Sequence, residues 1–255
     1  MFARCRSEGR AALIGYLPVG FPSYDVSVAA LAAMTAAGVD AVEVGMPYSD
    51  PLMDGPVIEA AVHQSLASGT RTRDTFTAVA AVAASGVPVL TMGYWNLVEA
   101  YGVGRFASDL KAAGGAGAIT PDLLPEEAAD WLAAATEHDL APVFLVAPSS
   151  SDERIAAVGR ANRGFIYAAS TMGVTGERSA VGSSARELVA RTRALTELPV
   201  AVGLGVSSGS QAAAVAEFAD AVIVGSALVR ALGTGGVEAV AVLTQELAAG
   251  VRGAE

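Results

Sequence analysis

Hydrophobic residues along this chain gather in eight short runs that are rich in β-branched side chains. The runs cover residues 12–19, 41–47, 87–94, 117–123, 141–148, 164–170, 199–206 and 220–227. Between them lie longer stretches rich in alanine and leucine, such as "YDVSVAALAAMTAAG" and "PEEAADWLAAATEHD", in which apolar residues recur at helical spacing. Strands that alternate with helices in this way predict parallel βαβ units.

The number of these units favours one fold class. Eight units in 255 residues predict a single (β/α)₈ TIM barrel, an α/β fold. Residues 1–255 are expected to form one domain, because no linker or shift in composition divides the chain. A doubly wound open sheet is the alternative, and it is disfavoured because no GxGxxG motif follows the first strand. In a barrel, the chemistry is expected at the C-terminal ends of the strands and in the loops that follow them.

The run at residues 41–47 places a carboxylate inside a strand. Strand alternation puts Glu43 on the same face as Ala41 and Gly45, whereas the two flanking valines point the other way. Burial of an unpaired carboxylate is costly or keeps the group protonated. Asp54 follows on a loop that contains three prolines, so two carboxylates are expected near one mouth of the barrel.

A structural interpretation of these acids is also open. Glu43 could pair with a buried cation, while Asp50 and Asp54 could cap turns. The functional interpretation is favoured because lysine and arginine are scarce in the neighbouring strand runs.

Glycine-containing loops follow the last three hydrophobic runs. Glycine lets an oxyanion approach the backbone closely, and the N–H groups at a helix N-terminus attract anions. Barrels of this class often bind phosphate after their last two strands. We expect a phosphate site there, and the alternative is that the glycines only form tight turns. The candidate residues are Thr175, Gly176, Gly205, Gly225 and Ser226.

Charge and composition exclude several classes of partner. The formal net charge is −10, and no block of lysine or arginine offers a nucleic-acid surface. Cys5 is the only cysteine, and His63 and His138 are the only histidines, so no metal site is expected. No apolar run approaches the roughly 18 residues that span a bilayer. The N-terminus also lacks the apolar region of a secretory signal, which indicates a cytoplasmic protein.

The acidic segment "VEVGMPYSDPLMDGPVIEAA" closely resembles the most diagnostic segment of the tryptophan synthase alpha subunit family. The likeness covers nearly the whole chain and includes "LIGYLPVGFPS", "TMGYWNLVEAYGVGRFASDL", "TMGVTGER" and "VGLGVSS". The family cleaves indole-3-glycerol phosphate to indole and glyceraldehyde 3-phosphate, a carbon–carbon lyase step of tryptophan biosynthesis. The resemblance implies that Glu43 is the general acid and base. It implies that Asp54 stabilises the positive charge that develops on the protonated indole ring.

The resemblance also implies the remaining substrate contacts. For the phosphate it names Gly176, Gly205, Gly225 and Ser226, and Thr171 stands where many relatives carry arginine. The stretch "GVTGERSAVGSSARE" is interpreted as a lid that closes over the substrate. An apolar slot for indole is expected from residues at or near the strand ends, namely Tyr16, Met92, Tyr94, Ile119, Tyr167 and Leu204.

A protein partner follows from the resemblance alone. The family forms an αββα complex in which indole passes to a beta subunit that holds pyridoxal phosphate. Asp50, Pro51 and Asn96 would meet that partner. No cofactor is expected in this chain, where the only lysine, Lys111, lies in a predicted helix.

Three alternatives to this function stay open. The chain could be a related phosphate-binding barrel isomerase or synthase, although the segment with Glu43 and Asp54 argues against it. It could be a non-catalytic activator of a beta subunit, which the presence of both carboxylates disfavours. A free-standing lyase without a partner would have the same site.

Overall fold

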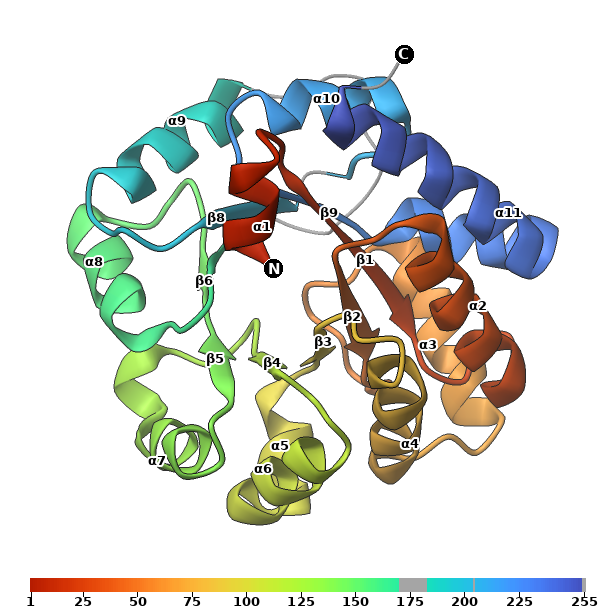
Figure 1. Cartoon of the computed structure of the whole chain (residues 1–255). Coiled ribbons are helices and arrows are strands. Elements are labelled where there is room, and N and C mark those ends of the chain that lie inside the picture. Colours follow the sequence, from red (N-terminus) through yellow and green to blue (C-terminus); the bar gives the residue numbers. More distant parts are fainter. Residues whose placement is uncertain (170–182, 204, 254–255) are drawn as a thin grey trace.

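The computed structural model describes residues 1–169, 183–203 and 205–253. Its parallel strands form a ring that is surrounded by helices (Figure 1). The strands follow one another in the order β5-β4-β3-β2-β1-β9-β8-β7-β6. This arrangement confirms the predicted barrel. The strands are β1 (Ala12–Pro18), β2 (Ala41–Gly45), β3 (Val89–Met92), β4 (Gly117–Ile119), β5 (Ala141–Val143), β6 (Leu145–Val146), β7 (Ile166–Ala169), β8 (Val200–Gly203) and β9 (Ala221–Val224).

The fifth predicted strand is divided in the structure. β5 and β6 are separated by Phe144 alone. The side chain of Asn162 satisfies the backbone at this point: Phe144 N donates to Asn162 Oδ1 at 3.0 Å, and Asn162 Nδ2 donates to Phe144 O at 3.1 Å. A side-chain amide thus replaces the strand ladder where the buried backbone would otherwise lack partners. The nine labelled strands therefore occupy the eight positions that the pattern predicts.

Helices cover the outside of the ring, and several begin and end where the sequence indicates. Ser23 caps α2 by accepting a hydrogen bond from Val26 N, and Gly38 ends this helix at φ 108°. The N-terminal helix α1 was not expected. The helices are α1 (Phe2–Ser7), α2 (Tyr24–Ala37), α3 (Pro56–Ala67), α4 (Thr72–Ala83), α5 (Trp95–Tyr101), α6 (Val103–Ala112), the 3₁₀ turn η1 (Pro125–Glu127), α7 (Ala129–Glu137), α8 (Asp152–Ala161), α9 (Ser183–Arg193), α10 (Gly209–Ala216) and α11 (Ser226–Arg252).

Two hydrophobic clusters lie on the two faces of the sheet. The inner cluster includes Ala41, Leu90 and Ile119, and it fills the barrel. The outer cluster, between the strands and the helices, contains Val42 and Val44. The alternation predicted for β2 is therefore confirmed, and Glu43 shares the inward face of Ala41.

Helix α1 closes the N-terminal end of the barrel through Asp40, which directly precedes β2. The Asp40 carboxylate accepts hydrogen bonds from Arg4 Nη2 at 2.7 Å, Arg10 Nη1 at 2.7 Å and Leu13 N at 3.0 Å. These donors hold the pKa of Asp40 at about 2, although burial acts in the opposite direction. The network ties the N-terminal segment to the start of the strand that carries Glu43.

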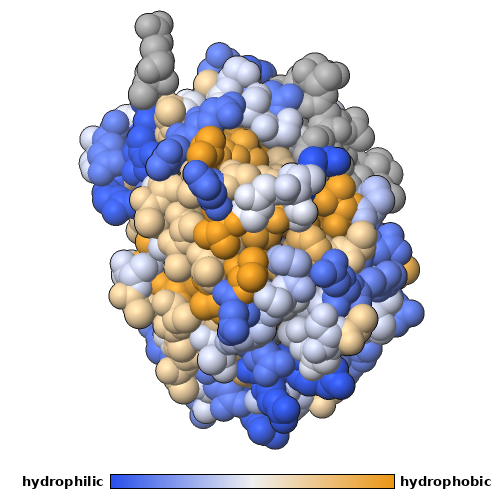
Figure 2. Space-filling view, turned by 90° about the vertical axis from the view of Figure 1, so that its right-hand side faces the viewer, coloured by the Kyte–Doolittle hydropathy of each residue, from blue (hydrophilic) through white to orange (hydrophobic). Residues whose placement is uncertain are grey.

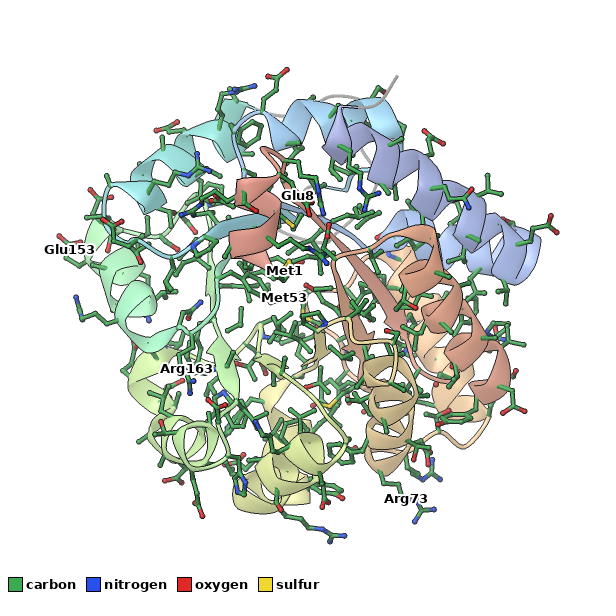
Figure 3. The ribbon with its side chains drawn as sticks, viewed as in Figure 1. Met1, Glu8, Met53, Arg73, Glu153 and Arg163 are labelled. Atoms are coloured by element: carbon green, nitrogen blue, oxygen red, sulfur yellow. The ribbon has the colours of Figure 1, made fainter. Side chains whose placement is uncertain are left out.

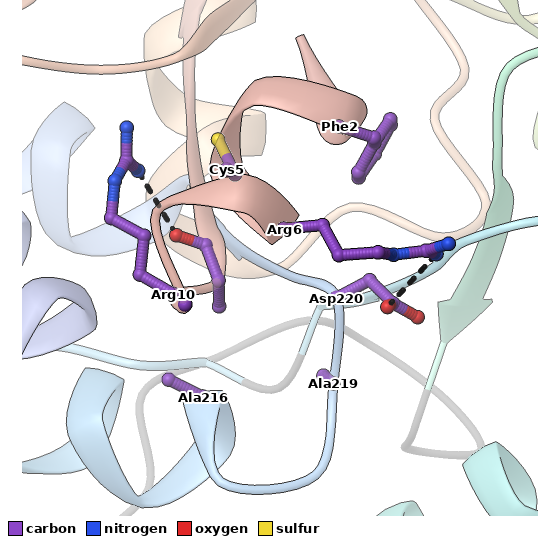
Figure 4. A pocket seen from close by; sticks show the side chains of 9 residues that line it. Phe2, Cys5, Arg6, Arg10, Ala216, Ala219 and Asp220 are labelled. Carbon is purple, nitrogen blue, oxygen red and sulfur yellow. Dashed lines mark hydrogen bonds and ion pairs between the residues drawn. The ribbon is translucent and has the colours of Figure 1, made fainter.

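A cavity of about 230 Å³ lies beside α1 at this same end (Figure 4). Across it, Arg6 Nη2 lies 3.8 Å from Asp220 Oδ1. The cavity is at the end of the barrel opposite to the loops that follow the strands. Its lining consists of Phe2, Cys5, Arg6, Gly9, Arg10, Ala11, Ala216, Ala219 and Asp220.

Helix α11 is long and apolar enough, by length and composition, to cross a membrane. It bends at Gly236, which has φ 68° and ψ −160°, and it packs along α2, α10 and β1. Figure 2 shows hydrophobic surface in the middle of the face on the right of Figure 1, the side on which α2 and α11 lie. Val242 of α11 is 60% exposed. Most of the large apolar side chains of α11 are buried by its packing against the barrel.

Candidate active site

Glu43 lies at the centre of β2 inside the barrel. It is 1% exposed, and its Oε1 atom has no hydrogen-bond partner. Among the described residues, no lysine or arginine forms an ion pair with it. Burial alone raises the pKa of Glu43 to about 8, because the charged form loses its hydration without compensation. The carboxyl is therefore mostly protonated at neutral pH and can donate a proton.

Tyr16 lies next to Glu43 on the neighbouring strand, since their Cα atoms are partners in the β1–β2 ladder. Two glycines make room for its ring. A Cβ atom at Gly45 would lie 2.5 Å from Tyr16 Oη, and one at Gly225 would lie 3.2 Å from Tyr16 Cδ1. Gly225 thus has a packing role inside the barrel in addition to any contact with an anion.

Tyr167 contributes a second phenol from β7. A Cβ atom at Gly203, its neighbour on β8, would lie 2.7 Å from Tyr167 Oη. Burial raises the pKa of Tyr167, and the charges of Glu43 and Asp54 raise it further. Burial followed by the same two charges also raises the pKa of Tyr16. Two phenols and two carboxyl groups therefore share one site.

Asp54 reaches this site from the loop between β2 and α3. Its side chain is partly buried, and its Oδ1 accepts a hydrogen bond from Tyr94 Oη at 3.3 Å. Burial raises the pKa of Asp54, the Tyr94 hydrogen bond lowers it, and the charge of Glu59 raises it. Tyr94 also accepts a hydrogen bond from Met53 N at 2.9 Å. One phenol therefore holds both the backbone and the side chain of this loop segment.

The other expected slot residues lie at strand ends. Met92 is the last residue of β3, and Ile119 is the last residue of β4 and fully buried. Tyr94 lies one residue beyond Gly93, which follows β3, and it is the N-cap of α5. In the view along the barrel, Met53 lies within the outline of the ring, whereas Arg73, Glu153 and Arg163 lie outside it (Figure 3). Leu204 lies outside the described residues.

Part of the expected phosphate site is described. Gly205 follows β8 with φ +71°, a conformation that favours glycine. Gly225 is the N-cap of α11 after β9, and Ser226 is the first residue of that helix. β8 and β9 pair as neighbours, so these loops lie at the same end of the ring. The N–H groups of the first turn of α11 lack partners within the helix and can bind an anion. The described residues do not include Thr171, Thr175 or Gly176. They include only the C-terminal part of the expected lid.

The expected partner residues lie on the rim of the same barrel end. Asp50 and Asn96 are exposed, and Pro51 is partly exposed. Large apolar side chains are exposed beside them in the loops after β2 and β4: Leu52 is 86% exposed and Leu124 is 40% exposed. Exposed apolar groups next to polar rim residues are typical of a surface that binds another protein.

Two further residues at this rim were missed by the sequence analysis. Asp122, after β4, accepts a hydrogen bond from Trp95 N at 2.9 Å and so caps α5. Tyr48, after β2, accepts a hydrogen bond from Asn96 Nδ2 at 3.0 Å. Aromatic hydroxyls in a rim loop generally need a polar partner, and this signal could have identified Tyr48. Across the described residues, no group of three or more His, Cys, Asp or Glu side chains is placed to hold a metal ion.

Comparison with known proteins identifies a family that matches this chain. The family model described as "Tryptophan synthase alpha chain" matches residues 2–252. The tryptophan synthase alpha chain of Mycobacterium intracellulare is 57% identical over 252 residues, which cover 99% of this chain and 93% of that protein. The alpha chain of Nocardia farcinica is 58% identical over 253 residues, which cover 99% of this chain and 95% of that protein.

Solved structures show the same similarity. A structure of Mycobacterium tuberculosis tryptophan synthase matches with a TM-score of 0.95 and 57% identity, over 98% of this chain and 96% of that one. The tryptophan synthase complex of Pyrococcus furiosus matches with a TM-score of 0.87 and 31% identity, over 96% of this chain and 98% of that one.

Proposed function

The chain belongs to the tryptophan synthase alpha chain family, and from this premise we propose how its residues carry out the reaction. The enzyme is a lyase that cleaves indole-3-glycerol phosphate to indole and glyceraldehyde 3-phosphate, and it works with a beta subunit in tryptophan synthesis. Residues 1–255 act as one domain. The observation that carries the proposal is the carboxyl of Glu43, which is buried inside the barrel with no hydrogen-bond partner for its Oε1 atom.

Glu43 acts first as an acid and then as a base. With its pKa raised to about 8, it is mostly protonated at neutral pH and gives its proton to C3 of the indole ring. The resulting carboxylate accepts the proton of the glycerol hydroxyl next to the ring. The bond between C3 and the glycerol carbon then breaks, its electrons return to the ring, and the hydroxyl carbon becomes the aldehyde. Glu43 ends the cycle protonated, as it began.

Asp54 stabilises the intermediate in which the indole ring carries a positive charge. Its carboxylate accepts a hydrogen bond from the indole N–H and lies near the developing charge. The hydrogen bond from Tyr94 supports this role because it favours the charged form of Asp54. The two acids thus have opposite tasks, which agrees with the unpaired environment of Glu43 and the hydrogen-bonded environment of Asp54.

The remaining candidates hold the substrate around these acids. Tyr16, Met92, Tyr94, Ile119, Tyr167 and Leu204 form the indole slot. The phosphate is bound by backbone N–H groups and the Ser226 hydroxyl at the start of α11, together with Thr175, Gly176, Gly205 and Gly225. The geometry of Gly205 and the free first turn of α11 support this assignment.

The rim residues Asp50, Pro51 and Asn96 are proposed to contact the beta subunit. The exposed side chains of Leu52 and Leu124 beside them support this placement. We propose that pyridoxal phosphate belongs to the beta subunit, that this chain works without a cofactor of its own, and that the complex is cytoplasmic.

An assay with indole-3-glycerol phosphate tests the proposal. We expect the chain to release indole, a beta subunit to raise the rate, and Glu43→Gln and Asp54→Asn each to abolish turnover while the fold is retained. Glu137→Gln, at the exposed end of α7, serves as a matched control and should keep the wild-type rate. Near-normal turnover in either active-site variant would refute the assignment. An unchanged rate on addition of the beta subunit would instead indicate a free-standing lyase.

A further inference from the structure

Tyr94 is hydrogen-bonded to the loop segment that carries Asp54. The Tyr94 hydroxyl accepts a hydrogen bond from Met53 N at 2.9 Å and donates one to Asp54 Oδ1 at 3.3 Å. Met53 and Asp54 lie on a loop outside any helix or strand, so no hydrogen-bond ladder of regular secondary structure holds their backbone. Movement of the Tyr94 ring therefore changes the position of the Asp54 carboxylate.

Tyr94 is in turn held by Tyr48. The two rings pack with centroids 5.2 Å apart and planes inclined by 33°. The Tyr48 hydroxyl accepts a hydrogen bond from Asn96 Nδ2 at 3.0 Å. The hydrogen bond and the ring contact together fix Tyr48 between Asn96 and Tyr94, and aromatic packing of this kind has a preferred geometry.

Asn96 is exposed, and the start of the helix that carries it is held by a hydrogen-bonded cap. It is the second residue of α5, and the first residue of that helix, Trp95, donates its backbone N–H to Asp122 Oδ1 at 2.9 Å and Oδ2 at 3.2 Å. The cap fixes the start of α5 to the loop after β4. The Asn96 side chain can therefore respond to a molecule bound at the rim while its backbone stays in place.

We propose that Tyr48 is a positioning residue that couples contact at Asn96 on the rim to the placement of Asp54 in the active site, through the ring of Tyr94. This coupling rests on the proposed function, in which Asn96 meets the beta subunit and Asp54 stabilises the charged ring. A bound partner that holds the Asn96 amide in one rotamer strengthens its bond to Tyr48. The rings then hold Asp54 more often in the productive position, which is a shift in population.

The variant Tyr48→Phe tests this coupling because it removes the hydroxyl and keeps the ring. Lyase rates are measured with and without a saturating concentration of beta subunit, so that a loss of affinity is separated from a loss of stimulation. We expect Tyr48→Phe to reduce the stimulation of kcat about fivefold, the effect of one hydrogen bond. Tyr101→Phe is the matched control, since it removes a hydroxyl that donates to Asp109 at 2.6 Å at the far end of α5.

A double-mutant cycle distinguishes coupling from simple packing. If the Asn96–Tyr48 bond transmits the effect, Tyr48→Phe, Asn96→Ala and the double variant should all lose the same stimulation. Additive losses, or full stimulation in Tyr48→Phe, would overturn the coupling. Wild-type protein that fails to cleave the substrate would overturn the proposed function itself, and the coupling with it.

The pH dependence gives a readout that a structural role would not change. Tyr94 and Glu59 change the pKa of Asp54, and the charge of Asp54 in turn raises the pKa values of Tyr16 and Tyr167. A looser Tyr94 weakens the hydrogen bond that lowers the pKa of Asp54. The acid limb of kcat/KM should therefore move to higher pH in Tyr48→Phe and stay in place in Tyr101→Phe. An unmoved limb in Tyr48→Phe would count against the coupling.

Discussion

Tyr16 lies directly beside Glu43 on the neighbouring strand, yet no hydrogen bond joins the two side chains. Their Cα atoms are partners in the β1–β2 ladder, and Glu43 Oε1 has no partner. The phenol instead packs over Gly45. Glu43 is therefore buried without a hydrogen bond from the neighbouring phenol, and its proton remains available to a substrate.

This arrangement depends on the absence of a side chain at position 45. A Cβ atom there would lie 2.5 Å from Tyr16 Oη, so Gly45→Ala must displace the phenol. We expect kcat/KM to fall by more than about tenfold, because the reacting groups lose their alignment. Gly104→Ala in α6 is the control, since a Cβ atom there meets nothing within 4 Å. Steady-state kinetics of both variants check this, and a wild-type kcat/KM in Gly45→Ala would show that Tyr16 need not stay in place.

The pH dependence of the reaction should report both carboxyl groups. Glu43 must begin protonated, so kcat/KM should fall as pH rises through about 8, the value to which burial raises its pKa. Asp54 must be ionised, so activity should also fall on the acid side, at a pH above the ordinary value of 3.8 because burial raises its pKa. A rate profile from pH 4 to 10 measures both limbs. Activity that keeps rising above pH 8 would contradict the role of Glu43 as the initial acid.

The same carboxyl should make stability depend on pH. Burial raises the pKa of Glu43 from 4.5 to about 8, so between these values the native state binds a proton that the unfolded state has lost. The unfolding free energy of the wild type therefore decreases through this window relative to that of Glu43→Gln. The total change should be on the order of 5 kcal/mol. Chemical denaturation of both proteins from pH 4 to 9 measures the difference, and parallel curves would show that Glu43 titrates normally.

The orientation of Glu43 could be predicted from the sequence because it depends only on strand alternation. Ala41 and Glu43 share one face whatever the rest of the chain does, and the inner cluster contains Ala41. The break at Phe144 could not be predicted in this way. It depends on a hydrogen bond with Asn162, which is 18 residues away and on another element.

The loop contacts of the site could not be predicted from the sequence either, because they also join residues that are far apart in the chain. Tyr94 and Asp54 are 40 residues apart, and the phenol could have had many partners. Local patterns indicate that a buried phenol needs a partner, but the fold determines which one it finds. The resemblance to a family identified both residues as site candidates and did not reveal the bond between them.

Asp40 is expected to stabilise the fold without affecting the chemistry. Its buried carboxylate accepts two hydrogen bonds from Arg10, at 2.7 and 2.8 Å, so Asp40→Asn leaves a cation poorly compensated. We expect a loss of about 3–5 kcal/mol in unfolding free energy. Glu8→Gln, which removes the more exposed partner of Arg10, should cost less than about 1 kcal/mol.

The effect of Asp40 also has a defined pH range. Its folded pKa is about 2, below the ordinary 3.8, so its contribution is fully present above pH 3.8 and is lost as pH falls through about 2. The penalty in Asp40→Asn should therefore be constant between pH 6 and 8, while kcat of the folded protein stays at the wild-type value. A penalty that changes across this range would show that another group dominates.

Ser226 tests the phosphate site with little risk to the fold. It is the first residue of α11 and not its N-cap, so alanine should preserve the helix. Loss of one hydrogen bond to a charged phosphate should raise KM about tenfold and leave kcat nearly unchanged, because substrate and transition state carry the same phosphate. Inhibition by inorganic phosphate should weaken by a similar factor. Ser68→Ala, which removes an exposed hydroxyl that bonds to Gln64 O at 3.0 Å, is the control. If Ser226→Ala lowers kcat and leaves phosphate inhibition intact, the anion binds elsewhere and Ser226 serves the barrel interior instead.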